Sequence, residues 1–266
     1  MPNFYAHIRF CLAVRRRLEP DLRAVLTAER DEFLCGGFGP DPLYFYTGHH
    51  GPVKLRQVGL ELHHHSGAEA LEPFRRPILE ERPYAASFAA GYLLHYLLDA
   101  HCHPFVRQVA GQGQITHFAL EGEYDRYLLQ RDGATYLDAF PKKQLPEAFL
   151  QLAAEMAPEV TPEIYQQSLR EFRWVSLKMG NWAGKPVRHA VNAVSHVPAA
   201  RPIRGMILNK EPDEGTREHL LTLDRLTEEA VEPAVEELAR FFEAVRENRP
   251  FSETLSRDFS GNGGEA

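Results

Sequence analysis

Cysteine is scarce in this sequence and shows no pairing pattern. The three cysteines are Cys11, Cys35 and Cys102, and no two of them form a CxxC motif. A disulfide framework needs more cysteines than this, and a thiolate zinc site needs closely spaced ones. The pattern therefore argues against both kinds of structure and fits a reducing compartment, so we expect a cytoplasmic protein.

Three further features are missing. No apolar run reaches the roughly 18 residues of a membrane-spanning helix, so no membrane span is expected. The first residues, MPNFYAHIRFCLAVRRR, place their positive charge after the apolar stretch, which is the reverse of a secretory signal. The formal net charge is −7. Because binding to a phosphate backbone needs clustered positive charge, we expect no stable complex with nucleic acid.

Strand-like alternation is also rare. Most segments repeat apolar residues at spacings of three and four, which is typical of helices packed on a core. We expect one all-α domain over residues 1–250, with residues 131–250 completing the bundle, and a flexible Gly-rich tail over residues 251–266. Helices are predicted at residues 5–18, 20–33, 53–80, 84–103, 117–131, 145–157, 162–179, 186–195 and 216–247.

Histidine, in contrast, is abundant, and ten of the 13 histidines precede residue 120. The segment GYLLHYLLDAHCHPF places His95, Asp99 and His103 at i, i+4 and i+8, on one face of an otherwise apolar helix. An unpaired buried carboxylate is costly, so a divalent cation is the simplest partner, and hydrogen-bonded core histidines are the alternative. Because Pro104 disfavours helical geometry before it, we expect the helix to end at His103, which then serves a neighbouring centre. His101 points elsewhere.

A second candidate pair of ligands follows the central helix. His117 and Glu121 have the i, i+4 spacing at which one helix gives a metal two ligands. Surface pairs use the same spacing, so this spacing alone does not indicate a metal site. The pair becomes a stronger candidate because a short Gly-containing turn can fold its helix against the central helix. Asp125 continues this stripe, either as a group that supports the ligands or as a surface charge.

Three other places offer candidate ligands. In FLCGGFGPDPLYFY, Asp41 stands between two prolines and is expected on a stiff, extended turn, as a metal ligand, a general base or a plain turn residue. In LELHHHSG, His63 and His64 both border an apolar face, and the pattern does not separate them. His7 lies among apolar residues, where a lone histidine is more often structural.

The ordered set of these motifs resembles the zinc-dependent phospholipase C family. This family includes bacterial phosphatidylcholine-cleaving enzymes and the catalytic domain of clostridial alpha-toxin, and the single-strand-specific fungal nucleases are more distant relatives. The resemblance covers residues 1 to about 130 and consists of an early His, an Asp after a Gly-rich turn, a His, HxxxDxxxH and HxxxE. It implies an all-α multi-helix bundle of the phospholipase C and single-strand-nuclease type, with a three-zinc cluster.

The resemblance also implies roles for individual residues. Asp99 would bridge two zinc ions, and Asp41 would be a ligand or the base that orients a water molecule. Secreted members use a free N-terminal Trp as a ligand; here we hypothesise that the Pro2 amine replaces it after removal of Met1. We expect two or three zinc ions per chain. The implied metal ligands are His7, Asp41, His63 or His64, His95, Asp99, His103, His117 and Glu121.

The expected function is that of a zinc-dependent phosphoesterase, which hydrolyses a phosphodiester with a metal-activated water. Its substrate would be a small-molecule phosphate ester or a phospholipid headgroup. The alternatives are a nuclease-like phosphodiesterase and a non-catalytic helical zinc-binding scaffold. A di-iron bundle is disfavoured because only Glu61–His64 gives a Glu-x-x-His motif, and the absence of a His-Asp dipeptide disfavours an HD-type phosphohydrolase.

Overall fold

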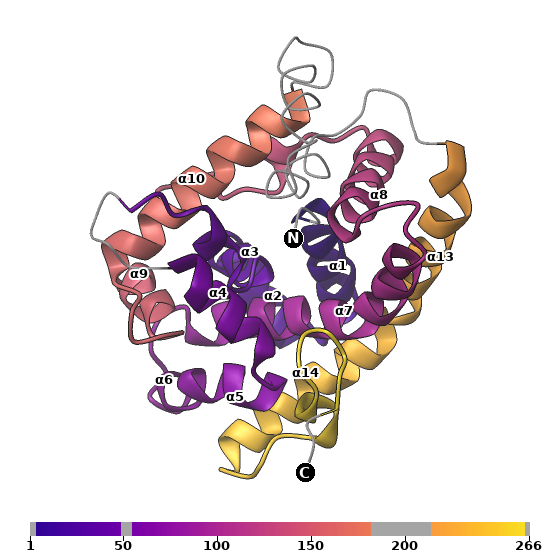
Figure 1. Ribbon diagram of the computed structural model, residues 1–266. Helices are drawn as coiled ribbons and strands as arrows, with labels where there is room; N and C mark the ends of the chain where they lie inside the picture. The colour runs from indigo at the N-terminus through magenta and orange to yellow at the C-terminus, as the bar shows by residue number, and fades with distance from the viewer. Residues whose placement is uncertain (1–3, 49–54, 182–213, 264–266) are drawn as a thin grey trace.

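The computed structural model describes residues 4–48, 55–181 and 214–263. Within these ranges the chain forms α-helices and short 3-10 helices joined by loops (Figure 1), and β-pairing is limited to two isolated bridges, Ser66–Asp258 and Arg257–Gly263. The prediction of an all-α fold is confirmed. The predicted helix at residues 186–195 lies outside the described residues.

The helices of the first half are α1 (Phe4–Arg17), α2 (Pro20–Ala28), α3 (Arg30–Gly37), η1 (Asp41–Phe45), α4 (Leu55–His64), α5 (Gly67–Leu71), η2 (Glu72–Phe74), α6 (Arg75–Leu79), α7 (Ala85–Gly111) and α8 (His117–Asp132). Those of the second half are η3 (Tyr136–Asp138), α9 (Glu147–Ala154), α10 (Pro162–Asn181), η5 (Glu214–Thr216), α13 (Arg217–Glu229), α14 (Val231–Arg246) and η6 (Glu253–Ser256). The symbol η marks a 3-10 helix.

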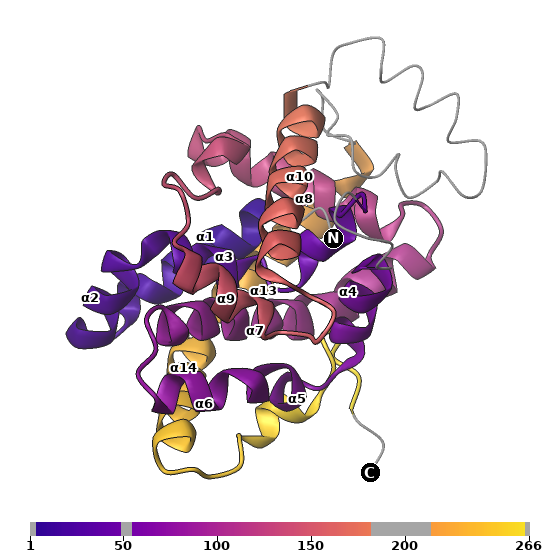
Figure 2. The same ribbon diagram turned by 90° about the vertical axis from the view of Figure 1, so that its left-hand side faces the viewer.

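Helix α7 runs through the middle of the molecule, as the side view in Figure 2 shows. It contacts α1, α3, α5, α6, α8, α9, α13 and α14. Its first sixteen residues, AASFAAGYLLHYLLDA, are apolar on every side, and a helix of this composition is stable only when it is enclosed by others. The polar residues within this stretch, Ser87, His95 and Asp99, are therefore buried together with its apolar ones.

Helices α3 and α7 cross with their backbones almost touching. A Cβ atom added to Gly36 would lie 2.1 Å from the carbonyl oxygen of Phe88, and one added to Gly91 would lie 2.1 Å from that of Phe33. Only glycine permits this approach. Because η1 follows α3 directly, the close crossing also brings η1 up to α7.

Three predicted helices are divided in the structure, namely those at residues 20–33, 53–80 and 216–247. The clearest division is at Ser66, which begins α5 with a capping box. Its hydroxyl accepts the backbone N–H of Glu69 at 3.2 Å, and the Glu69 carboxylate accepts the backbone N–H of Ser66 at 2.9 Å. The other two predicted helices are divided at Glu29 and Ala230.

The prediction that the central helix ends at His103 is wrong, because α7 continues to Gly111 with Pro104 inside it. A proline within a helix has no N–H for the carbonyl four residues earlier, which here is that of Ala100. Gly261, from the end of the chain, lies against this carbonyl, and a Cβ atom added to Gly261 would come within 2.6 Å of the oxygen. His103 consequently stays on the same helical face as His95 and Asp99.

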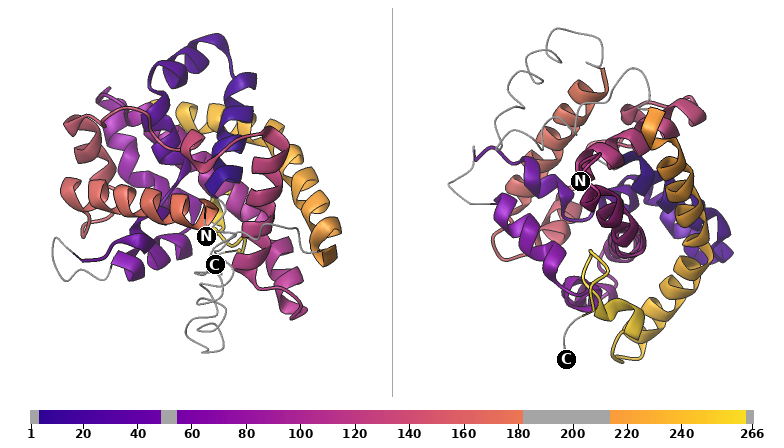
Figure 3. Two further views of the ribbon diagram at one scale, coloured as in Figure 1. Left: turned by 90° about the horizontal axis from the view of Figure 1, so that it is seen from above. Right: turned by 45° about the vertical axis from the view of Figure 1, so that its right-hand side comes forward.

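Helices of the second half enclose those of the first. The ring of Phe172 in α10 has no exposed surface and lies 4.2 Å from Phe4, 5.0 Å from Phe38 and 5.1 Å from Phe45, measured between ring centroids. On another side, α13 and α14 pack along α1, α7 and α8 (Figure 3). No helix within the described ranges is both long and apolar enough to cross a membrane.

The end of the chain differs from the flexible tail that its composition predicts. Residues 251–263 fold back onto the bundle, and Leu255 and Phe259 have no exposed surface. The Asp258 carboxylate accepts the backbone N–H groups of Ser260 and Asn262 at 2.9 Å. These hydrogen bonds close a short turn in this polar sequence. Residues 264–266 lie outside the described part of the chain.

Candidate metal centre

The site is built around one face of α7. His95, Asp99 and His103 are spaced four residues apart, so their side chains lie above one another. Their exposed fractions are only 0%, 4% and 6%, because other helices cover this face of α7. The stripe predicted from sequence therefore exists, and it includes His103 without any break in the helix.

Asp99 lies at the centre of the cluster, and its two carboxylate oxygens face different histidines. Oδ1 lies 3.2 Å from Nε2 of His7 and 3.4 Å from Nε2 of His103. Oδ2 lies 3.4 Å from Nε2 of His95 and 3.9 Å from Nε2 of His63. One carboxylate thus meets four imidazoles that come from three different helices.

Two further ligand candidates come from η1 and α4. Oδ1 of Asp41 lies 3.2 Å from Nε2 of His63. Asp41 begins η1, a 3-10 helix, rather than standing on the extended turn that the sequence predicts. Gly39, at a φ of +54°, leaves room for this arrangement, since a Cβ atom there would lie 2.3 Å from Cδ2 of His95.

His7 reaches the cluster from α1, and its ring stacks on that of His95 with the centroids 4.2 Å apart. The start of α1 is held by Asp125 of α8. The Asp125 carboxylate accepts the backbone N–H of Tyr5 at 3.0 Å and that of Ala6 at 2.9 Å, and the hydroxyl of Tyr136 donates to it at 2.9 Å. Asp125 is therefore a buried group that fixes the first turn of the helix carrying His7, and not a surface charge.

A second group of donors forms where α8 begins beside α7. Oε1 of Glu121 lies 2.9 Å from Nε2 of His117 and 3.2 Å from Nε2 of His103. Thr116 caps α8, its hydroxyl accepting the N–H of Ala119 at 3.3 Å, so both α8 donors sit in well-defined turns. The side chain of His117 is 30% exposed, whereas that of Glu121 is 2% exposed, so the cluster reaches solvent at His117.

Backbone carbonyls fix the orientation of two of the histidine rings, those of His63 and His95. Nδ1 of His63 donates to the carbonyl of Gly59 at 2.7 Å, and the Tyr44 hydroxyl lies 3.0 Å from the same nitrogen. Nδ1 of His95 donates to the carbonyl of Gly37 at 3.2 Å. A carbonyl can only accept a hydrogen bond, so in each ring it places the proton on Nδ1 and leaves Nε2 free to bind a cation.

Burial and neighbouring charges shift the pKa values in opposite directions. Burial alone would lower the pKa of His7, but the adjacent Asp99 carboxylate raises it above the usual value. Burial, reinforced by His7, lowers the pKa of His95 to about 3. For Asp99 and Glu121, burial opposes ionisation, yet the surrounding imidazoles outweigh it and hold both pKa values below their usual range. Both carboxylates and His95 are thus already in the protonation states that a metal requires.

The donor set fits divalent cations. Buried polar atoms normally have hydrogen-bond partners, yet four that face one another have no such partner among the residues that the structure describes, namely Asp41 Oδ1, His63 Nε2, His95 Nε2 and Asp99 Oδ2. Two ligands of one tetrahedral zinc ion lie roughly 3.3 Å apart, close to most of the distances above. Three groups have donor atoms within 4.8 Å of one another: His7, His95 and Asp99; Asp41, His63 and His95; and His103, His117 and Glu121.

Not every sequence candidate lies in the cluster. His64 is exposed and belongs to none of these groups within the described ranges, and His101, which was expected to point elsewhere, is exposed as well. Pro2, the hypothesised amine ligand, lies outside the described residues. Sequence reasoning missed the contributions of Gly39 and Phe259. Gly39 stands in the glycine-rich loop that drew attention to Asp41, so the loop was a usable signal, whereas nothing in the sequence pointed to Phe259.

One of three comparisons with known proteins identifies a family for this chain. A family model described as zinc dependent phospholipase C matches residues 6–177, which is more than half of the chain and includes every member of the three donor groups. The search of curated proteins and the search of solved structures return no match. The chain belongs to the zinc-dependent phospholipase C family, as the resemblance of its motifs implied.

Proposed function

We propose that this member of the family is a zinc-dependent phosphoesterase that hydrolyses a phosphodiester and holds two or three zinc ions in the cluster around Asp99. The observation that carries the proposal is the position of Asp99. Its two oxygens face donors of different groups, so a single carboxylate can serve two cations. A structural site for one zinc ion has no use for such sharing, whereas phosphoryl transfer at paired metals depends on it.

Bound zinc would act as a Lewis acid on phosphoryl oxygens and make a water molecule acidic near neutral pH. The chain's own residues would place and orient the reactants. Asp41 is 1% exposed, and its Oδ1, which has no hydrogen-bond partner in the described part of the chain, faces the cluster beside His63. We assign it as a ligand or as the group that accepts a proton from the attacking water. Asp99 would stay ionised throughout, because its neighbouring imidazoles stabilise its negative charge.

The substrate would approach from the side of His117, the most exposed member of the donor groups. A phosphate ester entering there meets the His103–His117–Glu121 group first, which suits contact with the departing oxygen. The Asp41–His63–His95 group lies deeper and suits orientation of the attacking water. A small phosphodiester or a phospholipid headgroup has the chemistry that these donors require.

The test combines metal analysis with hydrolysis. Purified protein is expected to carry at least two zinc ions per chain and to hydrolyse bis(p-nitrophenyl) phosphate. Asp99→Asn keeps the shape of the side chain but removes the shared charge, so we expect loss of zinc and a fall in hydrolysis of at least about 100-fold. The matched control is His101→Ala on the same helix, whose side chain is exposed and outside the donor groups.

The possible results lead to different conclusions. Less than one tightly bound zinc ion per chain would contradict the metal cluster. Stoichiometric zinc in wild-type protein that hydrolyses neither this ester nor phosphatidylcholine in detergent would favour the scaffold alternative. Circular dichroism of Asp99→Asn separates lost metal from lost fold, since a folded variant without zinc supports the proposal directly.

A further inference from the structure

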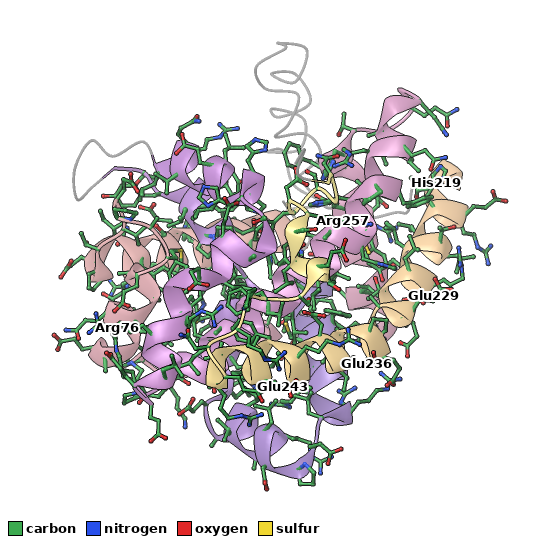
Figure 4. All side chains as sticks on the ribbon, turned by 90° about the horizontal axis from the view of Figure 1, so that it is seen from below. Arg76, His219, Glu229, Glu236, Glu243 and Arg257 are labelled. Carbon is green, nitrogen blue, oxygen red and sulfur yellow. The ribbon has the colours of Figure 1, made fainter. Side chains whose placement is uncertain are left out.

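The end of the chain crosses the back of the candidate metal centre. After α14 and η6, residues 257–263 return to α7 and pair with α5 through the Ser66–Asp258 bridge. Arg257, labelled in Figure 4, marks the point where this segment passes over the central helices, while Glu236 and Glu243 mark the outward face of α14. The segment lies beyond residues 6–177, which the family model matches.

Within this segment, Phe259 contacts three of the candidate ligands. Its backbone N–H donates to the carbonyl of His63 at 3.3 Å, and its own carbonyl accepts from Nδ1 of His103 at 2.8 Å. Its ring lies 5.0 Å from the ring of His63 and 5.9 Å from that of His95, measured between centroids. With 0% exposure, Phe259 excludes water from this side of the cluster.

Several hydrogen bonds hold Phe259 in this position. The Tyr96 hydroxyl of α7 lies 3.0 Å from the carbonyl oxygens of both Thr254 and Arg257. The backbone N–H of Gly67, at the start of α5, donates to the same Arg257 carbonyl at 3.0 Å. The segment is thereby tied to α5 and α7 on the side that precedes Phe259.

The side that follows Phe259 is fixed by close packing. Gly261 has a φ of +76° and lies against α7, where an added Cβ atom would be 2.6 Å from the Ala100 carbonyl oxygen and 3.0 Å from Cγ of Pro104. This is the carbonyl that Pro104 leaves without an N–H donor in the helix. A glycine is required there both by its backbone angle and by the space available.

We propose that Phe259 is a positioning residue for the centre formed by His103, His117 and Glu121, an inference that rests on the proposed function. The Phe259 carbonyl accepts the Nδ1 proton of His103 and thereby directs Nε2 of that ring toward Glu121 and Asp99. The rings of His63 and His95 take their orienting carbonyls from the first half of the chain, whereas His103 takes its own from the last ten residues. The C-terminal segment is therefore part of the site.

The experiment uses the full chain with Gly261→Ala, which should displace the segment while removing no side chain. We expect one zinc ion per chain to bind about 10–100-fold more weakly, measured by chelator competition, with the remaining zinc unchanged. The matched control is Gly263→Ala in the same segment, where an added Cβ atom meets nothing within 4 Å and zinc binding should equal that of wild type. Asp258→Ala, which opens the turn without adding an atom, should reproduce the weakening.

A second readout does not depend on bound metal. In the metal-free protein, the Nδ1 proton of His103, which the Phe259 carbonyl accepts at 2.8 Å, should be visible in proton–nitrogen spectra of wild type and lost through exchange with water in Gly261→Ala. If wild type binds no zinc, the proposed function fails, and the spectra still decide the role of Phe259. Unchanged zinc affinity together with unchanged His103 signals in both Gly261→Ala and Asp258→Ala would overturn the positioning role.

Discussion

At the scale of single residues, His63 and His64 show how neighbours in sequence reach different surroundings. His63 is 8% exposed, and its ring lies among Asp41, Tyr44 and Asp99. His64 is exposed at the last position of α4. Successive residues of a helix point about 100° apart, so when one side chain faces the cluster the next one faces away from it.

This pair gives a prediction with a built-in control. His63→Ala should remove one zinc ion per chain and lower phosphodiester hydrolysis by more than about 100-fold, because the Asp41 group loses one of its three donors. His64→Ala should leave both quantities at the wild-type level. Zinc analysis and bis(p-nitrophenyl) phosphate hydrolysis on the two variants measure this. Equal effects of the two substitutions would contradict the assignment of His63.

At the scale of elements, what matters is how each helix begins. Asp125 holds the first turn of α1 two residues before His7, and Ser66 starts α5 three residues after His63. Both are caps that satisfy the free N–H groups of a helix start. The ligands therefore sit beside helix ends whose positions are fixed, and this lowers the entropy lost when a cation is bound.

The capping box at Ser66 leads to a prediction about pH. Hydrogen bonds from Ser66 lower the pKa of the Glu69 carboxyl below its usual value of 4.5. A lowered folded-state pKa means that this carboxylate stabilises the fold above about pH 4.5 and loses that effect as the pH falls through the lower value. Glu69→Gln keeps an oxygen acceptor and loses only the charge, so we expect a loss of roughly 0.5 kcal/mol at pH 7.

The measurement is the free energy of unfolding in urea, compared between wild type and Glu69→Gln from pH 3 to pH 7. The difference in the free energy of unfolding between the two proteins should be largest at neutral pH and should vanish at the acid end of this range. A difference that grows as the pH falls would contradict the expected sign of the effect. Because Glu69 is exposed, the effect must stay small beside those of the buried cluster.

At the scale of the whole molecule, the donor groups join distant parts of the chain. His7 is on α1, Asp41 on η1, His63 on α4, His103 on α7 and Glu121 on α8. Cations held by these side chains would link five elements that otherwise meet through apolar packing and hydrogen bonds such as those of Asp125. Metal bound to the folded state and not to the unfolded one adds directly to the free energy of unfolding.

We therefore predict that removing zinc destabilises the fold. With free zinc at about 100 times its dissociation constant, binding adds about 2.7 kcal/mol. For a chain of this size that corresponds to a rise in melting temperature of roughly 5–10 °C. Thermal unfolding followed by circular dichroism, with chelator and then with zinc restored, measures the shift. A melting temperature that does not respond to either treatment would contradict a linking role for the metal.

The sequence by itself determined the helical class and most of the cluster. Apolar residues at spacings of three and four fix helices, and the spacing of four between His95, Asp99 and His103 fixes a shared face, because both follow from local geometry. The HxxxE spacing of His117 and Glu121 is local in the same way. These features needed no knowledge of which helices are neighbours.

Tertiary structure alone decided the rest, because the remaining features depend on contacts between distant segments. The choice between His63 and His64 followed from how α4 rotates against η1. The continuation of α7 past Pro104 depends on packing that no local rule includes. Phe259 lies in a polar, glycine-rich segment whose composition predicts flexibility. Its buried aromatic ring packs against histidines of α4 and α7, and this contact is visible only in the tertiary structure.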